Sequence, residues 1–131
     1  MARGESYNPD STMFCAELRY LTAFLDERQN VFVWIVDGIP TAFCTVRERN
    51  TKPFLGYAYI KDLYVLPERQ GRGIGKKLLT HTLAQMREKG FLHAVLECAE
   101  DNSGARRFYE RFGFGREVGG LNGYITYVID L

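Results

Sequence analysis

The sequence predicts one α/β domain in which a mixed, mostly antiparallel sheet of about six strands is flanked by helices. A strong hairpin turn at Asp37-Gly38 joins two apolar runs, which indicates a pair of antiparallel strands. A strand, a helix and another strand follow one another between residues 55 and 99, which indicates a right-handed crossover and one parallel pair. The 131 residues, 46% of them hydrophobic, supply material for one core. We therefore assign residues 1–131 to a single domain.

In the first part of the chain, a helix and three strands are expected. The helix starts after residue 10, since Asp10 or Ser11 can act as its N-cap and the following apolar residues fall along one stripe. This stripe consists of Phe14, Leu18, Leu21 and Leu25. Strands are expected at Val31 to Val36, at Thr41 to Arg47 and, after a polar loop, at Leu55 to Val65.

In the second part, two helices and three strands are expected. A helix from Ile74 to about Lys89 precedes a strand from Phe91 to Ala99, and a short helix then covers Ser103 to Phe112. A glycine follows each helix and suits its C-terminal end. The longer helix turns an apolar side toward the sheet, made of Leu78, Leu79, Leu83 and Met86. Two strands, around Phe114 to Val118 and from Tyr124 to Leu131, complete the chain.

The stretch from residue 65 to residue 77 is typical of a site that binds an anion. Gly71, Gly73 and Gly75 stand between a strand and a helix, and glycine lets backbone N–H groups approach a ligand closely. The first turn of a helix adds unpaired N–H groups and the positive end of the helix dipole. Lys76 and Lys77 are unfavourable in that turn unless a bound anion compensates them. The predicted ligand is a phosphate or pyrophosphate, and the alternative is a glycine-rich turn that binds nothing.

Two familiar nucleotide-binding motifs do not fit this stretch. A Walker A loop, G-x-x-x-x-G-K-[ST], requires glycine where Gln70 stands and serine or threonine where Lys77 stands. The dinucleotide motif G-x-G-x-x-G fails because the three glycines occupy every second position. Both motifs are therefore excluded for this loop.

The composition argues against several other classes of function. A formal net charge of +1 gives no electrostatic case for nucleic acid or a charged membrane as the main partner. No apolar run approaches the ~20 residues of a membrane span, and no signal segment opens the chain. Cys15, Cys44 and Cys98 lack C-x-x-C spacing, and neither histidine has a metal-ligand partner at a useful spacing. We expect a cytoplasmic protein with buried free thiols and no metal.

Several motifs occur together with the glycine-rich stretch. They are Asp62-Leu63-Tyr64-Val65 with Pro67, Gln70-Gly71-Arg72-Gly73-Ile74-Gly75, Asn102, Phe108-Tyr109 and Phe112-Gly113-Phe114. With these motifs the sequence resembles the GNAT family of N-acetyltransferases. The match runs from Tyr57 to Phe114, a little under half of the chain. The resemblance implies a GNAT-like sheet with a bulge and a splayed parallel strand pair at the cofactor site. It also implies acetyl-CoA as the donor and direct transfer of its acetyl group to a primary amine in a ternary complex.

The resemblance assigns the contacts of acetyl-CoA by position. The glycine-rich loop and the helix N-terminus bind the pyrophosphate, and backbone groups of the preceding strand bind the pantetheine arm. The two sets are Gln70, Gly71, Arg72, Gly73, Ile74, Gly75 and Lys76 for the loop, and Leu63, Tyr64 and Val65 for the strand. Asn102 matches a family position that contacts the cofactor, although asparagine is equally expected there as a helix cap.

The chemistry requires a base, an oxyanion donor and an acid. A primary amine with an unperturbed pKa near ~10 is protonated at neutral pH, so a base or a water chain must remove a proton before nitrogen attacks. The resemblance assigns the base to Glu97, while Asp62, Glu100 and water are the alternatives. It assigns the oxyanion to the amide of Val65 or its neighbours, and the acid to Tyr109. A core aromatic residue is the alternative interpretation of Tyr109.

The N-terminal segment departs from the family pattern. Family members usually begin with a strand and helices before the hairpin, whereas few residues precede the first expected helix here. The first strand is therefore absent, formed by Met1 to Asn8, or supplied by a partner subunit. The terminal strands also leave room for a homodimer.

The acceptor stays open between a small-molecule amine and a peptide amine. Tyr124 and Tyr127 are expected in the core or on the sheet surface. They are also candidates for the wall of the acceptor site, because the connection before the last strand often forms this wall in the family. The alternative function is a non-catalytic acyl-CoA-binding regulatory module. The presence of both Glu97 and Tyr109 argues against it.

Overall fold

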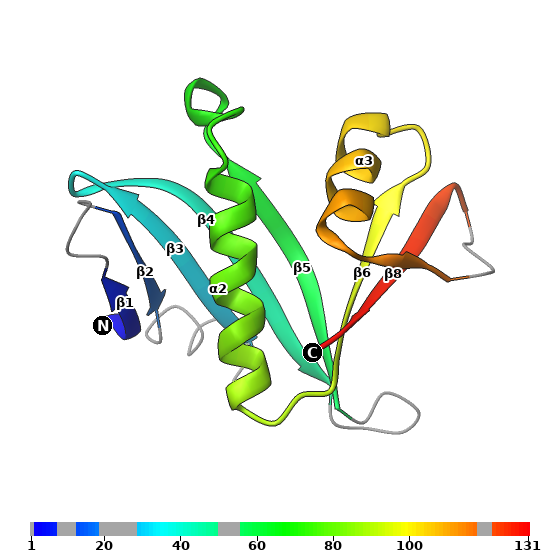
Figure 1. The fold of residues 1–131 in the computed structure, drawn as a ribbon, viewed down its shortest axis with the longest axis horizontal. Coiled ribbons are helices and arrows are strands. Elements are labelled where there is room, and N and C mark those ends of the chain that lie inside the picture. Colours follow the sequence, from blue (N-terminus) through cyan, green and yellow to red (C-terminus); the bar gives the residue numbers. More distant parts are fainter. Residues whose placement is uncertain (1, 8–12, 19–28, 50–55, 118–121) are drawn as a thin grey trace.

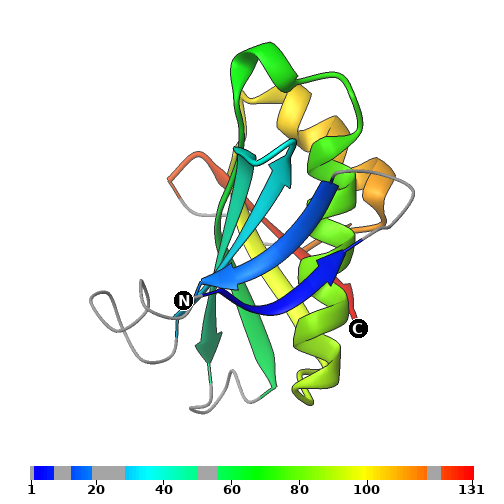
Figure 2. The same cartoon turned by 90° about the vertical axis from the view of Figure 1, so that its left-hand side faces the viewer.

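The computed structural model describes residues 2–7, 13–18, 29–49, 56–117 and 122–131 of the chain. These residues form one eight-stranded sheet, and two helices lie against one of its faces (Figures 1 and 2). The strand order across the sheet is β1-β2-β3-β4-β5-β6-β8-β7, and all neighbours are antiparallel except β5 and β6. The predicted fold class, a mixed and mostly antiparallel α/β sheet, is confirmed.

The N-terminal part of the sheet differs from the helix expected there. β1 (Ala2–Tyr7) pairs antiparallel with β2 (Met13–Leu18), and β2 pairs antiparallel with β3 (Gln29–Val36). The helix expected after residue 10 is therefore wrong for residues 13–18. Without β2, β3 would present an unpaired backbone edge, and the hydrogen bonds made across this edge prevail over the helical spacing of a few apolar residues. The expected helix beyond residue 18 lies outside the described residues, and β1 agrees with a first strand formed within residues 1–8.

The central hairpin forms as predicted. β3 continues into β4 (Ile39–Arg49) through Asp37 and Gly38, whose φ angles of 51° and 77° suit a type I′ turn. β5 (Tyr57–Val65) then returns antiparallel to β4. The register between β4 and β5 shifts along this pair, which leaves Lys61 as the extra residue of a β-bulge.

The crossover after β5 is also confirmed. A short 3₁₀ turn, η1 (Pro67–Arg69), leads through the glycine-rich loop into α2 (Ile74–Glu88). β6 (His93–Ala99) follows and runs parallel to β5. Gly90, just past the helix, has a φ of 95°, a conformation that glycine adopts without strain.

The C-terminal part comprises α3 (Ser103–Phe112), β7 (Gly115–Arg116) and β8 (Tyr124–Asp130). α3 begins and ends at the predicted residues. The six predicted strands correspond to β3 through β8, and β1 and β2 bring the total to eight. Val118, predicted as the end of a strand, lies outside the described residues.

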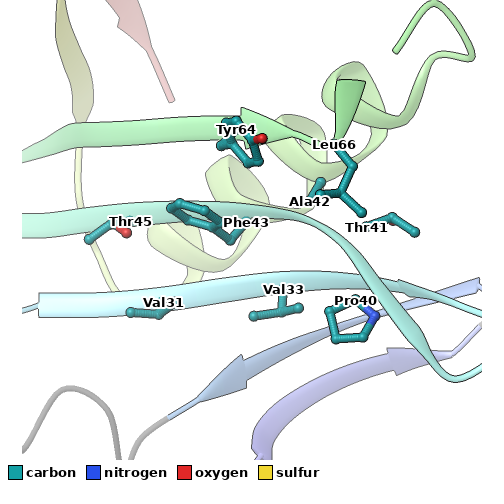
Figure 3. A pocket seen from close by; sticks show the side chains of 9 residues that line it. All are labelled: Val31, Val33, Pro40, Thr41, Ala42, Phe43, Thr45, Tyr64 and Leu66. Carbon is teal, nitrogen blue, oxygen red and sulfur yellow. The ribbon is translucent and has the colours of Figure 1, made fainter. Parts of the chain in front are cut away.

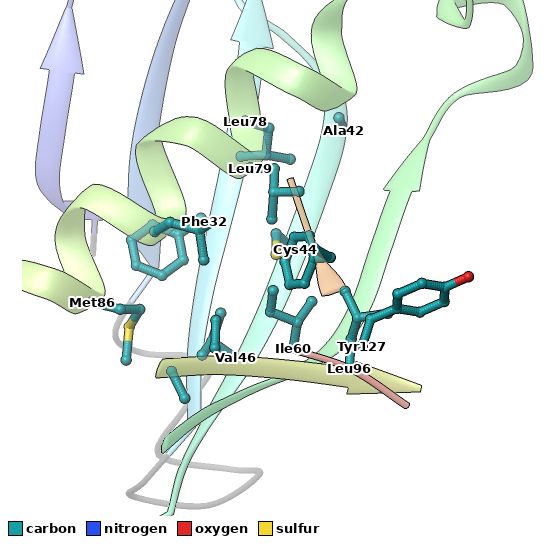
Figure 4. Close-up of a cluster of buried hydrophobic side chains, with 14 of the residues drawn as sticks. Phe32, Ala42, Cys44, Val46, Ile60, Leu78, Leu79, Met86, Leu96 and Tyr127 are labelled. Atoms are coloured by element: carbon teal, nitrogen blue, oxygen red, sulfur yellow. The ribbon is translucent and has the colours of Figure 1, made fainter. Parts of the chain in front are cut away.

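The two faces of the sheet have different surroundings. α2 and α3 pack on what we call the helix face, where the four predicted apolar residues of α2 are all buried (Figure 4). Fully buried residues of this core include Phe32, Leu78, Leu79, Met86, Leu96 and Tyr127. On the opposite face, which we call the open face, no helix lies in the part of the chain that the structure describes. Within the same ranges, neither helix is long and apolar enough to cross a membrane.

Candidate functional site

β5 and β6 separate toward their C-terminal ends. Their pairing covers only residues 57–59 with residues 93–95, although β5 extends to Val65 and β6 to Ala99. The bulge at Lys61 lies just past the last paired residue of β5, and the two strands then diverge (Figure 1). We call this place the split. Among the described residues, no strand pairs with the edge of residues 60–65 of β5 that faces β6. The backbone groups that point to this edge are therefore available to a ligand, apart from the carbonyl of Val65, which accepts a hydrogen bond from the side chain of Gln70. The expected bulge and splay are confirmed.

The loop after β5 ends in a helix whose N-terminus carries no side-chain cap. Gly71 and Gly73 have φ angles of 78° and 77°, which other residues rarely adopt. No heavy atom lies within 4 Å of a Cβ added at either position, so the space beside both glycines is open. Gly73 is the N-cap of α2, and no side chain bonds to the helix end there. The N–H groups of the first turn are therefore available to an anion.

Two hydrogen bonds fix the loop to the sheet. The side chain of Gln70 donates from Nε2 to the carbonyl oxygen of Val65 at 3.1 Å. The N–H of Leu66 donates to the carbonyl of Thr41 at 2.9 Å. Gln70 thus holds the loop against the end of β5, beside the split.

A cavity of about 440 Å³ lies between this loop and α3. We call it the glycine-loop pocket, and it is lined by Gly71, Gly73, Lys76, Gly104, Arg107, Phe108, Arg111 and Phe112. Three of these side chains are cationic and none is acidic. The pocket therefore combines backbone donors, positive charge and aromatic surface, which suits a phosphorylated ligand that carries a flat ring.

Arg107 and Arg111 were not predicted as site residues. They stand four residues apart on α3 and therefore share one side of that helix. A Cβ added to Gly75 would lie 3.6 Å from the ring of Phe108, which shows how closely α3 approaches the loop. The arginine pair was visible in the sequence. Without knowledge of how α3 packs beside the loop, two arginines at this spacing indicate only a solvated side of a helix.

Asn102 caps α3. Its Oδ1 accepts a hydrogen bond from the N–H of Ala105 at 3.2 Å, so the helix-cap interpretation is confirmed. In the same turn, Arg106 donates from Nη1 to the carbonyl of Glu100 at 3.2 Å. These bonds fix the connection between β6 and α3, on which Tyr109 depends for its position.

Tyr109 projects from α3 onto the helix face at the split. Its ring makes edge contacts with Phe108 and Phe114, at centroid separations of 5.3 and 5.7 Å. The pKa of Tyr109 is raised to about 12, mainly by burial and further by the neighbouring thiols of Cys44 and Cys98. Cys44 belongs to β4 and Cys98 to β6, so Tyr109 lies between the strands on either side of β5. Tyr109 is partly buried and packs against the core, in agreement with the alternative interpretation, and its phenol stays protonated at neutral pH.

The two tyrosines expected at the acceptor wall lie on different faces. Tyr127 is fully buried on the helix face, where its hydroxyl donates to Oε2 of Glu110 at 2.5 Å. The core interpretation of Tyr127 is therefore confirmed, and Tyr127 does not form part of an acceptor wall, because the alternation of β8 turns it into the core. Tyr124, three residues earlier, falls on the open face and is half exposed.

The candidate bases gather on the open face. Glu97 is exposed on the open face, because its neighbours along β6 point into the core. It stands opposite Thr126 of β8. Asp62 is exposed and stands opposite Thr45 of β4. The two carboxylates thus flank the split from β6 and from β5, whereas Glu100 lies in the turn after β6. Within the described ranges, no three His, Cys, Asp or Glu side chains are grouped so that they could hold a metal ion.

A second cavity, of about 450 Å³, lies on the open face (Figure 3). We call it the open-face pocket, and it is lined by Val31, Val33, Pro40, Thr41, Ala42, Phe43, Thr45, Tyr64 and Leu66. Phe43 and Tyr64 are 38% and 44% exposed, and their ring centroids are 5.6 Å apart. Of these residues, only Tyr64 was predicted at the site, and only through its backbone. The continuous apolar run of β3 was visible in the sequence, but it does not show which face of the sheet lacks a helix.

Sequence comparison identifies the family. Residues 3–114 match the sequence model of the acetyltransferase (GNAT) family. The chain is similar to N-alpha-acetyltransferase 30 of Schizosaccharomyces pombe, with 43% identity over 58 residues, which are 44% of this chain and 39% of that protein. It is also similar to 5-NmdU N-acetyltransferase of Pseudomonas phage PaMx11, with 29% identity over 126 residues, which are 92% of this chain and 81% of that protein. The match to the yeast protein thus spans well under half of its length.

Structural comparison agrees with this assignment. The fold is similar to that of PaiA N-acetyltransferase of Thermoplasma acidophilum in complex with coenzyme A, with a TM-score of 0.74 and 22% identity. The similarity covers 85% of this chain and 66% of that chain. At this identity it shows a shared fold. Since the family model covers most of the chain, the protein belongs to the acetyltransferase (GNAT) family.

Proposed function

We propose that the protein transfers an acetyl group from acetyl-CoA to a primary amine by direct attack in a ternary complex. The observation that carries this proposal is the split between β5 and β6. A cationic pocket lies beside it on the helix face, and two carboxylates flank it on the open face. A donor and an acceptor that approach from these two sides would meet between the strands.

The glycine-loop pocket fits the charged part of acetyl-CoA. The first-turn N–H groups of α2 and the clear space beside Gly71 and Gly73 suit the pyrophosphate. Lys76, Arg107 and Arg111 supply charge for the pyrophosphate and the 3′-phosphate. Of the loop residues assigned by resemblance, Arg72, Ile74 and Gly75 would contribute backbone N–H groups, while Gln70 would position the loop.

The uncharged arm of the donor fits the split. Backbone groups of Leu63, Tyr64 and Val65 would pair with the amides of pantetheine, because this edge of β5 has no strand partner among the described residues. The amide nitrogen of Asn102, whose Oδ1 already caps α3, would contact the arm from the other side. The thioester would then lie near the bulge, between the two faces of the sheet.

Glu97 is the proposed base. An alkylammonium must lose a proton before its nitrogen can attack the thioester carbon, and an exposed carboxylate at the split can accept that proton directly or through water. Asp62 is the nearest competitor, on the other side of the split. The oxyanion that forms on the thioester would be stabilised by the N–H of Val65 or a neighbouring amide.

Tyr109 is the proposed acid for the leaving thiolate. When the new C–N bond forms and the C–S bond breaks, the thiolate of CoA must gain a proton, and the buried phenol of Tyr109 holds one at neutral pH. Burial also raises the pKa of the nearby Cys98 thiol, which shows that these surroundings disfavour a thiolate. These surroundings would therefore favour protonation of a thiolate released there.

A thiol-release assay tests the proposal. The protein is mixed with acetyl-CoA and a panel of primary amines, and free CoA and acetylated amine are quantified together, while calorimetry measures CoA binding. We expect CoA binding and equal amounts of CoA and acetylated amine. CoA binding without acceptor-dependent release from any amine would favour the non-catalytic acyl-CoA-binding module. A cytoplasmic location and a homodimer stay predictions from the sequence.

A further inference from the structure

We propose that the acceptor is a small primary amine that carries an aromatic or similarly apolar group, which the open-face pocket receives. This inference rests on the proposed function and narrows its acceptor. It places the ammonium of the acceptor at the carboxylate of Asp62, beside the split, and the apolar group of the acceptor in the adjacent open-face pocket.

The lining of the open-face pocket is almost entirely apolar. Seven of its nine lining residues have hydrocarbon or aromatic side chains, and the hydroxyl of one of the two threonines, Thr41, already donates to the carbonyl of Trp34 at 3.0 Å. Among the residues that the structure describes, no charged side chain lines it. A polyamine would place a second ammonium in these surroundings without a partner, which is strongly unfavourable. A peptide would bring backbone groups that find few hydrogen-bond partners there.

The exposed aromatic pair suits a flat apolar group. Phe43 and Tyr64 stand directly opposite each other on β4 and β5, and their rings are tilted by 36° (Figure 3). Both remain about two-fifths exposed, although large aromatic side chains gain free energy from burial. An aromatic ring laid against this pair would bury surface on all three rings and add the specific attraction of offset aromatic contacts.

The pocket is continuous with the carboxylate that flanks the split. Asp62 and Tyr64 are two residues apart on β5 and therefore share a face. Asp62 also stands opposite Thr45, which lines the pocket. An ammonium at Asp62 would thus lie at the rim of the pocket on the side of the split, where the thioester is expected.

The spacing of the strands sets the length of the acceptor. Phe43 stands opposite Tyr64, two residues along β5 from Asp62, so Phe43 and Asp62 are diagonal neighbours that lie roughly 7–8 Å apart. A ring two or three carbons from the nitrogen can span this offset, because the side chains of Asp62 and Phe43 extend over the same face. The cavity of about 450 Å³ falls in the range of small-molecule sites, which are roughly 300–1,000 Å³.

The inference is tested with four acceptors: 2-phenylethylamine, ethylamine, spermidine and a short peptide with a free N-terminus. We expect kcat/KM for 2-phenylethylamine to exceed that for each of the others by about tenfold or more. Spermidine or the peptide as the better substrate would overturn the inference and leave the proposed function intact. Calorimetric binding of 2-phenylethylamine to the protein–CoA complex without turnover would contradict the proposed function and support the acceptor class. Absence of both binding and turnover of 2-phenylethylamine would overturn the inference.

A variant of the pocket separates the apolar contact from general damage. Phe43→Ala should raise KM for 2-phenylethylamine about tenfold with little change in kcat, and should leave ethylamine and the Kd of CoA unchanged. Phe43→Leu should restore part of the loss. Leu92→Ala removes a side chain that is 61% exposed and outside the pocket lining, and it serves as the matched control. An equal loss for ethylamine in Phe43→Ala would contradict the assignment.

Discussion

The glycine-loop pocket and the open-face pocket have nearly the same volume, about 440 and 450 Å³, but opposite chemistry. The first has three cationic side chains and a helix N-terminus, and the second has no charged lining residue within the described ranges. Charge recognises a ligand over several ångströms and weakens in salt, whereas apolar contact acts only on touching surfaces and persists in salt. In the proposed reaction, the donor would therefore be selected by its phosphates, and the acceptor by its shape and hydrophobicity. The proposed chemistry lies between them, at the split.

The largest effect on turnover is expected at Tyr109, which lies at the split and belongs to the lining of neither pocket. Tyr109→Phe removes the proposed acid and should lower kcat by about 10²–10⁴-fold, while the Kd of CoA changes little. Because the pKa of Tyr109 is raised to about 12, the phenol is protonated at every assay pH between 6 and 9. The loss should therefore be the same across that range, as measured by thiol release at each pH. Unchanged turnover over the full range would remove Tyr109 from the mechanism.

The two carboxylates at the split should respond differently to loss of charge. Glu97→Gln removes the proposed base and should lower kcat about 10²-fold, whereas Asp62→Asn removes the proposed partner of the ammonium and should mainly raise KM for the amine. Both side chains are exposed, so neither change should unfold the protein. Steady-state kinetics at saturating acetyl-CoA measures both. The reverse pattern, a kcat effect at Asp62 and none at Glu97, would exchange the two roles.

The two pockets should also differ in their response to salt. Arg107→Gln and Arg111→Gln should each raise the Kd of CoA about fivefold at low ionic strength, and the difference from the unmodified protein should shrink as salt is added. KM for 2-phenylethylamine should stay almost unchanged in both variants. Arg116→Gln, an exposed arginine outside the pocket lining, is the matched control. A salt-independent Kd for CoA would contradict the proposal that the cationic glycine-loop pocket binds the phosphates of CoA.

The sequence predicted the donor side of the molecule better than the acceptor side. Local signals determine the hairpin at Asp37-Gly38, the start of α2 at Ile74 and the whole of α3, because turn residues, caps and helical spacing act over a few positions. The β2 strand was missed because its partner, the edge of β3, is a tertiary feature that outweighs helical spacing. The open-face pocket was missed for the same kind of reason.

The pairing between elements decided the site residues in the same way. The arginine pair of α3 becomes part of a site only because the helix packs beside the glycine-rich loop. The sequence left Tyr127 open between the core, the sheet surface and the acceptor wall, because the phase of a strand depends on its partners: Tyr127 stands opposite Leu96, a core residue of β6. Periodicity within one segment predicts that its side chains alternate between the two faces of the sheet. Only the pairing with the neighbouring strand determines which of the two sets is buried.

The smallest effect is expected from the loss of a hydrogen bond between β8 and α3, the helix that lines the glycine-loop pocket. The hydroxyl of Tyr127 on β8 donates to Glu110 on α3, the helix that also carries Arg107 and Arg111. Tyr127→Phe should lower the free energy of unfolding by about 1 kcal/mol, because Glu110 is exposed and can exchange the lost donor for water. Urea unfolding measures this loss. The Kd of CoA should rise less than threefold and KM for the amine should not change, since the open-face pocket lies on the other side of the sheet. An equal rise in both would show that the two pockets are coupled through α3 and the split.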